Sequence, residues 1–224
     1  MKHYAVLALL ALLVHAQPAM AAAPGSTGEL AYDARLSTYR YQFDVHFFEL
    51  ESQRQSLQMA YSYLAGGKDK PVVVLLHGKN FNGDYWAQTA RFLQSLGYGV
   101  LIPDQVGFGK SSKPEYYQYS FAALATHTRD LMRSLDIKRA LIMGHSMGGM
   151  LASRFALMYP HRVQQLILLN PIGLENYLQY VEYKDTDFFY QLELAKTPEG
   201  IRRYQQKNYY DGRWNDTYAS LTHF

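Results

Sequence analysis

The chain has 224 residues, of which 48% are hydrophobic and 18% charged, a balance typical of a globular protein that buries a sizeable core. The formal net charge of +3 arises from interspersed acidic and basic residues, so the composition gives no argument for a nucleic-acid partner. The absence of cysteine excludes disulfides and zinc–thiolate sites, and we predict neither a cofactor nor a bound metal.

The N-terminal 21 residues have the pattern of a secretory signal peptide. Lys2 precedes an apolar run over residues 4–14, and a small-residue A-x-A site of the kind that signal peptidase cleaves ends at Ala21. The apolar run is shorter than the roughly 20 residues of a membrane-spanning helix, so we expect export to the periplasm or the medium without stable membrane insertion. A membrane anchor and a wrongly assigned start codon are the alternatives.

Residues 22–170 are predicted to form an α/β core, although their first part, to about residue 36, is a turn-prone lead-in. Aromatic and β-branched residues predict a hairpin of two strands, 43–50 and 57–64, joined through the polar stretch 51–56. The apolar run 72–76 is continuous, which indicates a strand buried on both faces.

The rest of this core alternates between helix and strand. The predicted elements are a helix over 83–96, a strand over 100–102, a helix over 120–135, a strand over 140–143, a helix over 147–158 and a strand over 166–169. Such alternation indicates βαβ units, and therefore a mostly parallel sheet of six strands with helices on both faces. Aromatic residues then crowd residues 171–224 without a buried-strand run, so we interpret that stretch as the start of a helical cap.

A nucleophile motif lies between two of these elements. Residues 144–148 read GHSMG and match G-x-S-x-G, in which a sharp strand-to-helix turn exposes a serine hydroxyl. The pentapeptide follows a predicted strand and opens a predicted helix, which is the context that the motif requires. Ser146 is therefore the predicted catalytic nucleophile, and an ordinary turn with an incidental serine is the alternative.

A second element supports an acyl-transfer site. His77 and Gly78 follow the buried strand, and a glycine there frees the backbone to turn its amides toward the serine. The main-chain amides of Lys79 and Met147 are the predicted oxyanion-hole donors. We expect the Lys79 ammonium group itself to be an ordinary surface charge.

The sequence at this point resembles the α/β-hydrolase family, in particular its single-domain members with a helical cap. The resemblance covers about residues 41–175 and rests on His77-Gly78, on 104–111 (DQVGFGKS), on 144–149 (GHSMGG) and on Asn170-Pro171. The stretch 104–111 is similar to the corresponding loop of epoxide hydrolases, dehalogenases and carbon–carbon bond hydrolases. The first two groups use aspartate where this chain has Ser146, so the resemblance favours acyl transfer over alkyl displacement.

The base and the acid of a catalytic triad are harder to find. The family order is serine, acid, histidine, and only His161 and His223 follow Ser146. His161 comes after a predicted helix that would place it roughly 20 Å from the serine. His223, with Asp211 or Asp216 before it, satisfies the order but follows no further predicted strand.

Other side chains give no better partner. Some relatives carry the acid where this chain has Asn170, which is an amide. His77 and His145 are expected to be packed or hydrogen-bonded, and His127 has no assigned role. The simplest interpretation is a C-terminal truncation that removes the acid and the histidine together with the last strands of the sheet.

Three functions remain open at this stage. The first is a serine hydrolase that acts on a small apolar carboxylic ester and is inactive as this fragment. The second is a carbon–carbon bond or amide hydrolase with the same serine site. The third is a non-catalytic binding or remnant protein. An uncovered last strand would also favour oligomers that pair their edges.

Overall fold

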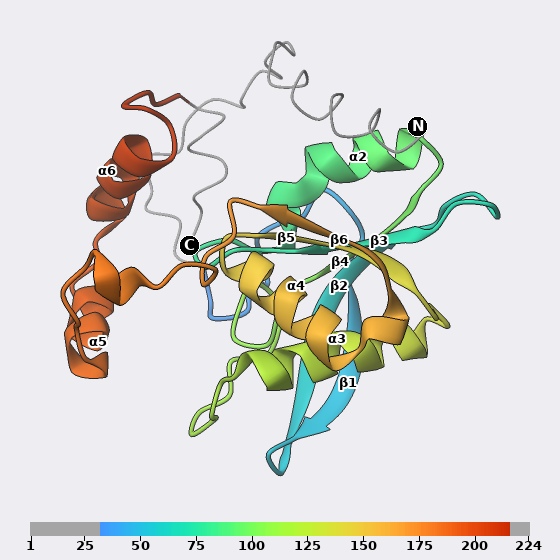
Figure 1. The fold of residues 1–224 in the computed structure, drawn as a ribbon, viewed down its shortest axis with the longest axis horizontal. Coiled ribbons are helices and arrows are strands. Elements are labelled where there is room, and N and C mark those ends of the chain that lie inside the picture. The colour runs from blue at the N-terminus through green and yellow to red at the C-terminus, as the bar shows by residue number, and fades with distance from the viewer. Residues whose placement is uncertain (1–31, 216–224) are drawn as a thin grey trace. The chain divides into compact units, whose positions relative to one another are not determined.

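The computed structural model describes residues 32–215 (Figure 1). The predicted signal peptide and most of the predicted lead-in lie outside the described residues, as do Asp216 and His223. The helices are η1 (Gly83–Trp86), α2 (Ala87–Ser95), α3 (Phe121–Ser134), α4 (Met147–Met158), η2 (Pro160–Arg162), η3 (Tyr177–Gln179), α5 (Thr186–Leu194) and α6 (Pro198–Asn208).

A single six-stranded sheet organises the described residues. Its strands are β1 (His46–Ser52), β2 (Gln55–Leu64), β3 (Val72–Leu76), β4 (Gly99–Pro103), β5 (Ala140–His145) and β6 (Val163–Leu169), and their order is β1-β2-β4-β3-β5-β6. β2 is antiparallel to both of its neighbours, whereas β4, β3, β5 and β6 are parallel to one another. The predicted mostly parallel sheet is therefore confirmed.

The alternating side chains of the central strand feed two separate cores. Val74 and Leu76 pack on the face covered by α3 and α4, while Val73 and Leu75 pack on the face covered by α2. All four side chains are at most 1% exposed, as predicted for a strand buried on both faces. Figure 1 shows the helices on the two sides of the sheet.

The hairpin connection differs from the prediction. Residues 51–56 are not a polar loop, because Glu51 pairs with Ser56 and the turn consists only of Gln53 and Arg54. Both turn residues have positive φ, 50° and 63°, which suits the right-handed twist of a two-residue hairpin. The polar side chains misled the sequence prediction because this end of the edge hairpin is largely solvated.

The predicted helix over 83–96 is also different in detail. It begins as the 3₁₀ turn η1, capped by the Asn82 side chain, which accepts a 2.9 Å hydrogen bond from the amide of Asp84. The regular helix α2 starts only at Ala87.

After β6, the described part of the chain is helical, as expected for the start of a cap. α5 has no buried residue, and in α6 only Gln205 is buried. Large apolar side chains on this segment are extensively exposed, among them Leu178, Tyr180, Phe189 and Leu194. Within residues 32–215, no helix combines the length and the apolar character needed to cross a membrane.

Candidate active site

Ser146 occupies a strained turn between β5 and α4. Its φ of 55° and ψ of −118° lie in a region that side-chain-bearing residues rarely adopt. Its amide donates to the carbonyl of Leu169 at 3.1 Å, and its own carbonyl accepts from Gly149 at 2.9 Å and from Ile172 at 3.3 Å. These bonds hold the turn against the end of β6 and keep the serine partly exposed.

The flanking glycines are required by close packing. A Cβ on Gly144 would lie 2.0 Å from the carbonyl oxygen of Gly148, and one on Gly148 would lie 2.1 Å from the carbonyl oxygen of Leu76. Both contacts are with backbone atoms, which cannot move aside without shifting β3 or α4. The turn therefore has the tight strand-to-helix geometry that the motif predicts.

The structure brings the predicted oxyanion segment against the serine. A Cβ built on Gly78 would lie 3.2 Å from the Cβ of Ser146, so the two residues approach closely and a side chain at position 78 would be crowded. Among residues 32–215, no backbone carbonyl accepts a hydrogen bond from the Lys79 amide. Met147 is the first residue of α4, where helix amides have no intrahelical acceptor and favour negative charge.

The Lys79 side chain has a partner that the sequence did not predict. Its ammonium group forms an ion pair with Glu193 on α5, and Lys196 binds the same carboxylate at 2.6 Å. Partial burial opposes ionisation of Glu193, but hydrogen bonds from Lys196 and Lys79 bring its pKa below the usual value. This ion pair connects the loop after β3 to α5.

Two histidines next to the site are hydrogen-bonded, as predicted. His77 is fully buried, its Nε2 accepts from the amide of Gln105 at 3.0 Å, and its Nδ1 lies 2.9 Å from the carbonyl oxygen of Gly78. His145 Nδ1 lies 3.2 Å from the hydroxyl of Tyr85. Burial lowers the pKa of both imidazoles, so both are neutral at pH 7.

An aromatic cluster that the sequence analysis missed surrounds His145. Phe81 stacks on Tyr85 with ring centroids 4.8 Å apart, and Tyr85 contacts Trp86 at 4.7 Å. Tyr209, which follows α6, contacts Phe81 edge-on at 6.2 Å. The cluster places aromatic rings against His145, the residue before Ser146, and joins the segment after α6 to the loop after β3.

A buried carboxylate organises the loop after β4. Asp104 is 1% exposed and accepts hydrogen bonds from the Tyr41 hydroxyl at 2.7 Å, the Lys110 amide at 2.8 Å and the Gly83 amide at 2.5 Å. A Cβ on Gly109 would lie 2.1 Å from this carboxylate. The motif over residues 104–111 thus folds around Asp104, and in this structure the aspartate has a structural role.

No triad base is found in the described residues. Within residues 32–215, no side chain is hydrogen-bonded to Ser146 Oγ. His161 lies in η2, beyond the opposite end of α4 from Ser146, as the sequence predicted. Among residues 32–215, neither an acid nor a histidine is hydrogen-bonded to Ser146 in the way that a triad requires.

Comparison with known proteins decides the family. Residues 71–217 match the model of the alpha/beta hydrolase fold family, which is more than half of the chain. The chain belongs to the α/β-hydrolase family. In this α/β-hydrolase, the matched residues include the turn at Ser146 and the parallel strands β4, β3, β5 and β6.

Its relatives include several hydrolases. A crystal structure of a protein described as a probable hydrolytic enzyme, from Pseudomonas aeruginosa, has 46% identity and a TM-score of 0.80, and the match covers 84% of this chain and 61% of that chain. A fluoroacetate dehalogenase of a Burkholderia species is 37% identical over 55% of this chain and 40% of its own length. A 2-hydroxy-6-oxo-2,4-heptadienoate hydrolase of Pseudomonas putida is 33% identical over 46% of this chain and 38% of its own length. The match to three uncharacterised mycobacterial proteins covers 30% of their length, so the α/β-hydrolase chain spans less than half of these curated relatives.

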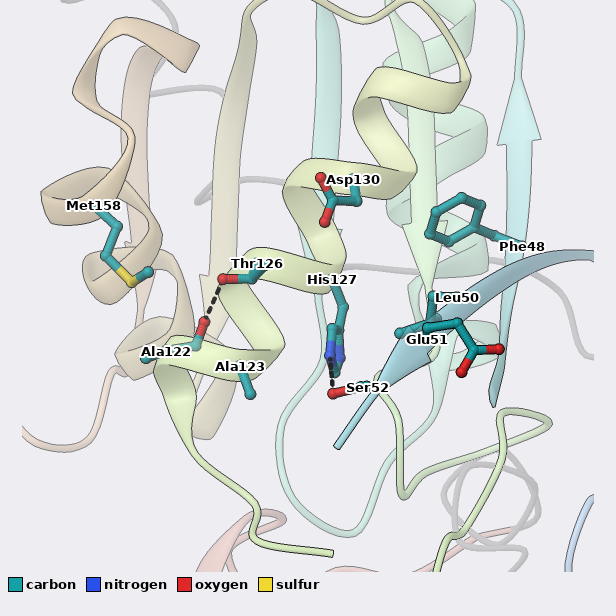
Figure 2. A pocket seen from close by; sticks show the side chains of 10 residues that line it. All are labelled: Phe48, Leu50, Glu51, Ser52, Ala122, Ala123, Thr126, His127, Asp130 and Met158. Atoms are coloured by element: carbon teal, nitrogen blue, oxygen red, sulfur yellow. Dashed lines mark hydrogen bonds between the residues drawn. The ribbon is translucent and has the colours of Figure 1, made fainter. Parts of the chain in front are cut away.

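The α/β-hydrolase also has a groove of about 500 Å³ away from Ser146, between β1 and α3 (Figure 2). Here Ser52 Oγ and His127 Nε2 are 3.2 Å apart, a separation that a nucleophile and its base could have. The hydroxyl of Ser52 is also bound to Tyr117 at 2.8 Å, and His127 Nδ1 has no partner among the described residues. Asp130 is paired with Arg129 instead, so this groove is not the candidate site.

Proposed function

We propose that this α/β-hydrolase is a serine hydrolase that cleaves a small apolar carboxylic ester through an acyl-enzyme, with Ser146 as the nucleophile. The observation that carries the proposal is the strained turn at Ser146. Strain of this kind persists where the surroundings hold it and is common at catalytic positions. The turn presents a hydroxyl that is hydrogen-bonded to no side chain among residues 32–215, and a Cβ built on Gly78 would lie 3.2 Å from the Cβ of Ser146.

In the proposed mechanism, Ser146 Oγ attacks the ester carbonyl carbon and its proton passes to a general base. Negative charge then develops on the carbonyl oxygen, where the amides of Lys79 and Met147 would donate hydrogen bonds. The leaving alcohol takes a proton, and water hydrolyses the acyl-enzyme by the same path. The base and its acid lie outside the described contacts of Ser146, so the mechanism names no residue for them.

The aromatic cluster supports an apolar substrate. The rings of Phe81, Tyr85 and Tyr209 pack together beside His145, the residue before the serine, and ligand pockets are mostly apolar with few polar groups. The serine itself supports acyl transfer, because a hydroxyl nucleophile with an oxyanion hole is suited to carbonyl substrates.

A carbon–carbon bond hydrolase is the second candidate. It is favoured by the Pseudomonas putida relative, whose name is that of a 2-hydroxy-6-oxo-2,4-heptadienoate hydrolase. The same serine site would act on a ketone carbonyl there. Export, as predicted from residues 1–21, is also a proposal, and cell fractionation with an antibody to the protein would test it.

The decisive experiment compares p-nitrophenyl butyrate with a 2-hydroxy-6-oxo-dienoate as substrates. We expect the 224-residue chain to turn over the ester at close to the background rate, since no described base contacts Ser146. A form of the protein that has a triad acid and histidine should hydrolyse the ester and lose up to about a millionfold in kcat on Ser146→Ala.

The matched control is Ser52→Ala, which removes the serine of the second groove and should leave the rate unchanged. Activity that survives in Ser146→Ala would contradict the proposal. Preferential turnover of the dienoate would select the carbon–carbon bond hydrolase. Binding of these compounds without turnover by a form that has a triad acid and histidine would make the protein a non-catalytic binder.

A further inference from the structure

The hydrogen bonds of His77 fix its proton on one nitrogen. The amide of Gln105 can only donate, so His77 Nε2, 3.0 Å away, must accept with a free lone pair. In the neutral ring the proton is then on Nδ1, which donates to the carbonyl oxygen of Gly78 at 2.9 Å. The ring is fully buried, and its edge contact with Phe108, at 5.2 Å between centroids, also holds its orientation.

This bond controls the peptide that joins Gly78 to Lys79. In a trans peptide the carbonyl oxygen and the following amide hydrogen lie in one plane and point in opposite directions. Holding the Gly78 carbonyl against the His77 ring therefore directs the Lys79 amide away from that ring. Gly78 has no side chain to restrict its rotation, so an external hydrogen bond is needed to keep one orientation.

The other side of Gly78 faces the serine turn. A Cβ built on Gly78 would lie 3.2 Å from the Cβ of Ser146 and 3.4 Å from the carbonyl oxygen of His145. The Lys79 amide is the next donor along the chain, and no described backbone carbonyl accepts from it.

We infer that His77 is a positioning residue, which holds the Gly78–Lys79 peptide so that the Lys79 amide faces the oxyanion. The inference rests on the proposed function and adds to it a residue that does not touch the substrate. Donation into the Gly78 carbonyl also polarises the peptide and strengthens the Lys79 amide as a donor, because hydrogen bonds in a chain reinforce one another.

Two substitutions separate this role from simple packing. In His77→Asn the side-chain amide nitrogen can take the place of Nδ1 and still donate to Gly78. In His77→Gln the longer side chain reaches the place of Nε2 and can accept from Gln105, but the donor to Gly78 is lost. If His77 were needed only for packing, both substitutions would lower the activity to a similar extent.

The first measurement is steady-state hydrolysis of p-nitrophenyl butyrate by a form of the protein that shows Ser146-dependent turnover, with active sites counted by titration. We expect His77→Gln to lower kcat by up to about a hundredfold at nearly unchanged KM, the size of effect seen when one oxyanion donor is disturbed. His77→Asn should stay within a few-fold of the wild-type kcat. Equal kcat for the wild type and His77→Gln would overturn the inference.

The second measurement needs no activity and so separates this inference from the proposed function. Glycine labelled with ¹³C at its carbonyl carbon, combined with ¹⁵N-lysine, leaves three directly bonded Gly–Lys pairs, Gly67-Lys68, Gly78-Lys79 and Gly109-Lys110. We expect the Lys79 amide signal to move in His77→Gln and to be retained in His77→Asn. The Lys68 and Lys110 signals report whether each variant is folded.

The tautomer itself can be measured in the unmodified protein. Long-range ¹⁵N–¹H correlation should show a neutral His77 with its proton on Nδ1 at about pH 7. A proton on Nε2, or a Lys79 signal that is unchanged in His77→Gln, would overturn the inference even if both variants were too unstable for kinetics. A wild type without Ser146-dependent turnover would refute the proposed function while the two spectroscopic outcomes still decide how the peptide is held.

Discussion

The strained backbone at Ser146 predicts how two substitutions of this serine differ in stability. Replacing Ser146 by glycine should stabilise the fold relative to replacing it by alanine, although both changes remove the nucleophile. The φ of 55° with ψ of −118° destabilises a residue that has a Cβ by about 1 to 3 kcal/mol. Glycine adopts this conformation without that steric penalty. Glycine also adds about 0.4 to 1 kcal/mol of freedom to the unfolded chain, which acts in the opposite direction.

The expected net difference therefore ranges up to about 2.6 kcal/mol, with a central value of about 1.3 kcal/mol, in favour of Ser146→Gly over Ser146→Ala. Loss of the hydroxyl itself should matter little, because no described side chain is hydrogen-bonded to it. Urea unfolding followed by tryptophan fluorescence measures the difference, since Trp86 is 4% exposed and reports on the core. The slopes with urea must agree between variants for the midpoints to be compared.

Ser153 provides a control with the opposite sign. It lies within α4 and its hydroxyl donates to the Gly149 carbonyl at 2.9 Å. In a helix interior glycine is less favourable than alanine by about 1 kcal/mol. Ser153→Gly should therefore have a lower free energy of unfolding than Ser153→Ala. If Ser146→Gly were no more stable than Ser146→Ala while the Ser153 pair behaved as expected, the strain argument would be refuted.

Two further predictions concern acid sensitivity and association. Burial lowers the pKa of His77 from its ordinary value, so this group binds its proton more readily in the unfolded chain. The stability that His77 contributes should be fully present above about pH 6.5 and decline below it, by at most about 1.4 kcal/mol per pH unit, until the native pKa is reached. Burial also lowers the pKa of His127 and His145, which add to the same decline. Urea midpoints at several pH values would check this, and a decline that is unchanged in His77→Asn would contradict it. β6 is an edge strand among the described residues and Leu166 is 37% exposed, so the 224-residue chain should elute from size exclusion as an oligomer that Leu166→Lys weakens, whereas a soluble wild-type monomer would contradict the prediction.

Elements with strong apolar patterns could be predicted from the sequence because their signal is local. The run over residues 72–76 predicted β3 with the bounds that the structure has. The turn at Gln53 and Arg54 could not be predicted, because neither residue is the glycine or asparagine that normally marks two central positions at positive φ. Polar residues that continue a solvated strand look like a loop in the sequence.

Only those residues of the candidate site that belong to a local sequence motif could be predicted from the sequence. Ser146 and Gly78 were found because a strand-to-helix turn and a close backbone approach both leave glycines in the sequence. The bond from Gln105 to His77 joins loops that follow β3 and β4, and the contact of Phe81 with Tyr209 spans core and cap. Such contacts depend on how distant segments are placed, which no local pattern records.

The strained serine is held because the elements on both of its sides are fixed independently. In β5, Ile142 belongs to the core under α3 and α4, while Met143 belongs to the core under α2. In α4, Phe155 is fully buried in the first of these cores. Relaxing the turn would require β5 to move in two cores at once or α4 to leave its contacts, and either would cost more than the 1 to 3 kcal/mol or so that such strain stores. The same rigidity holds Gly78 against Ser146, so the geometry that strains the nucleophile also positions the peptide that we propose to bind the oxyanion.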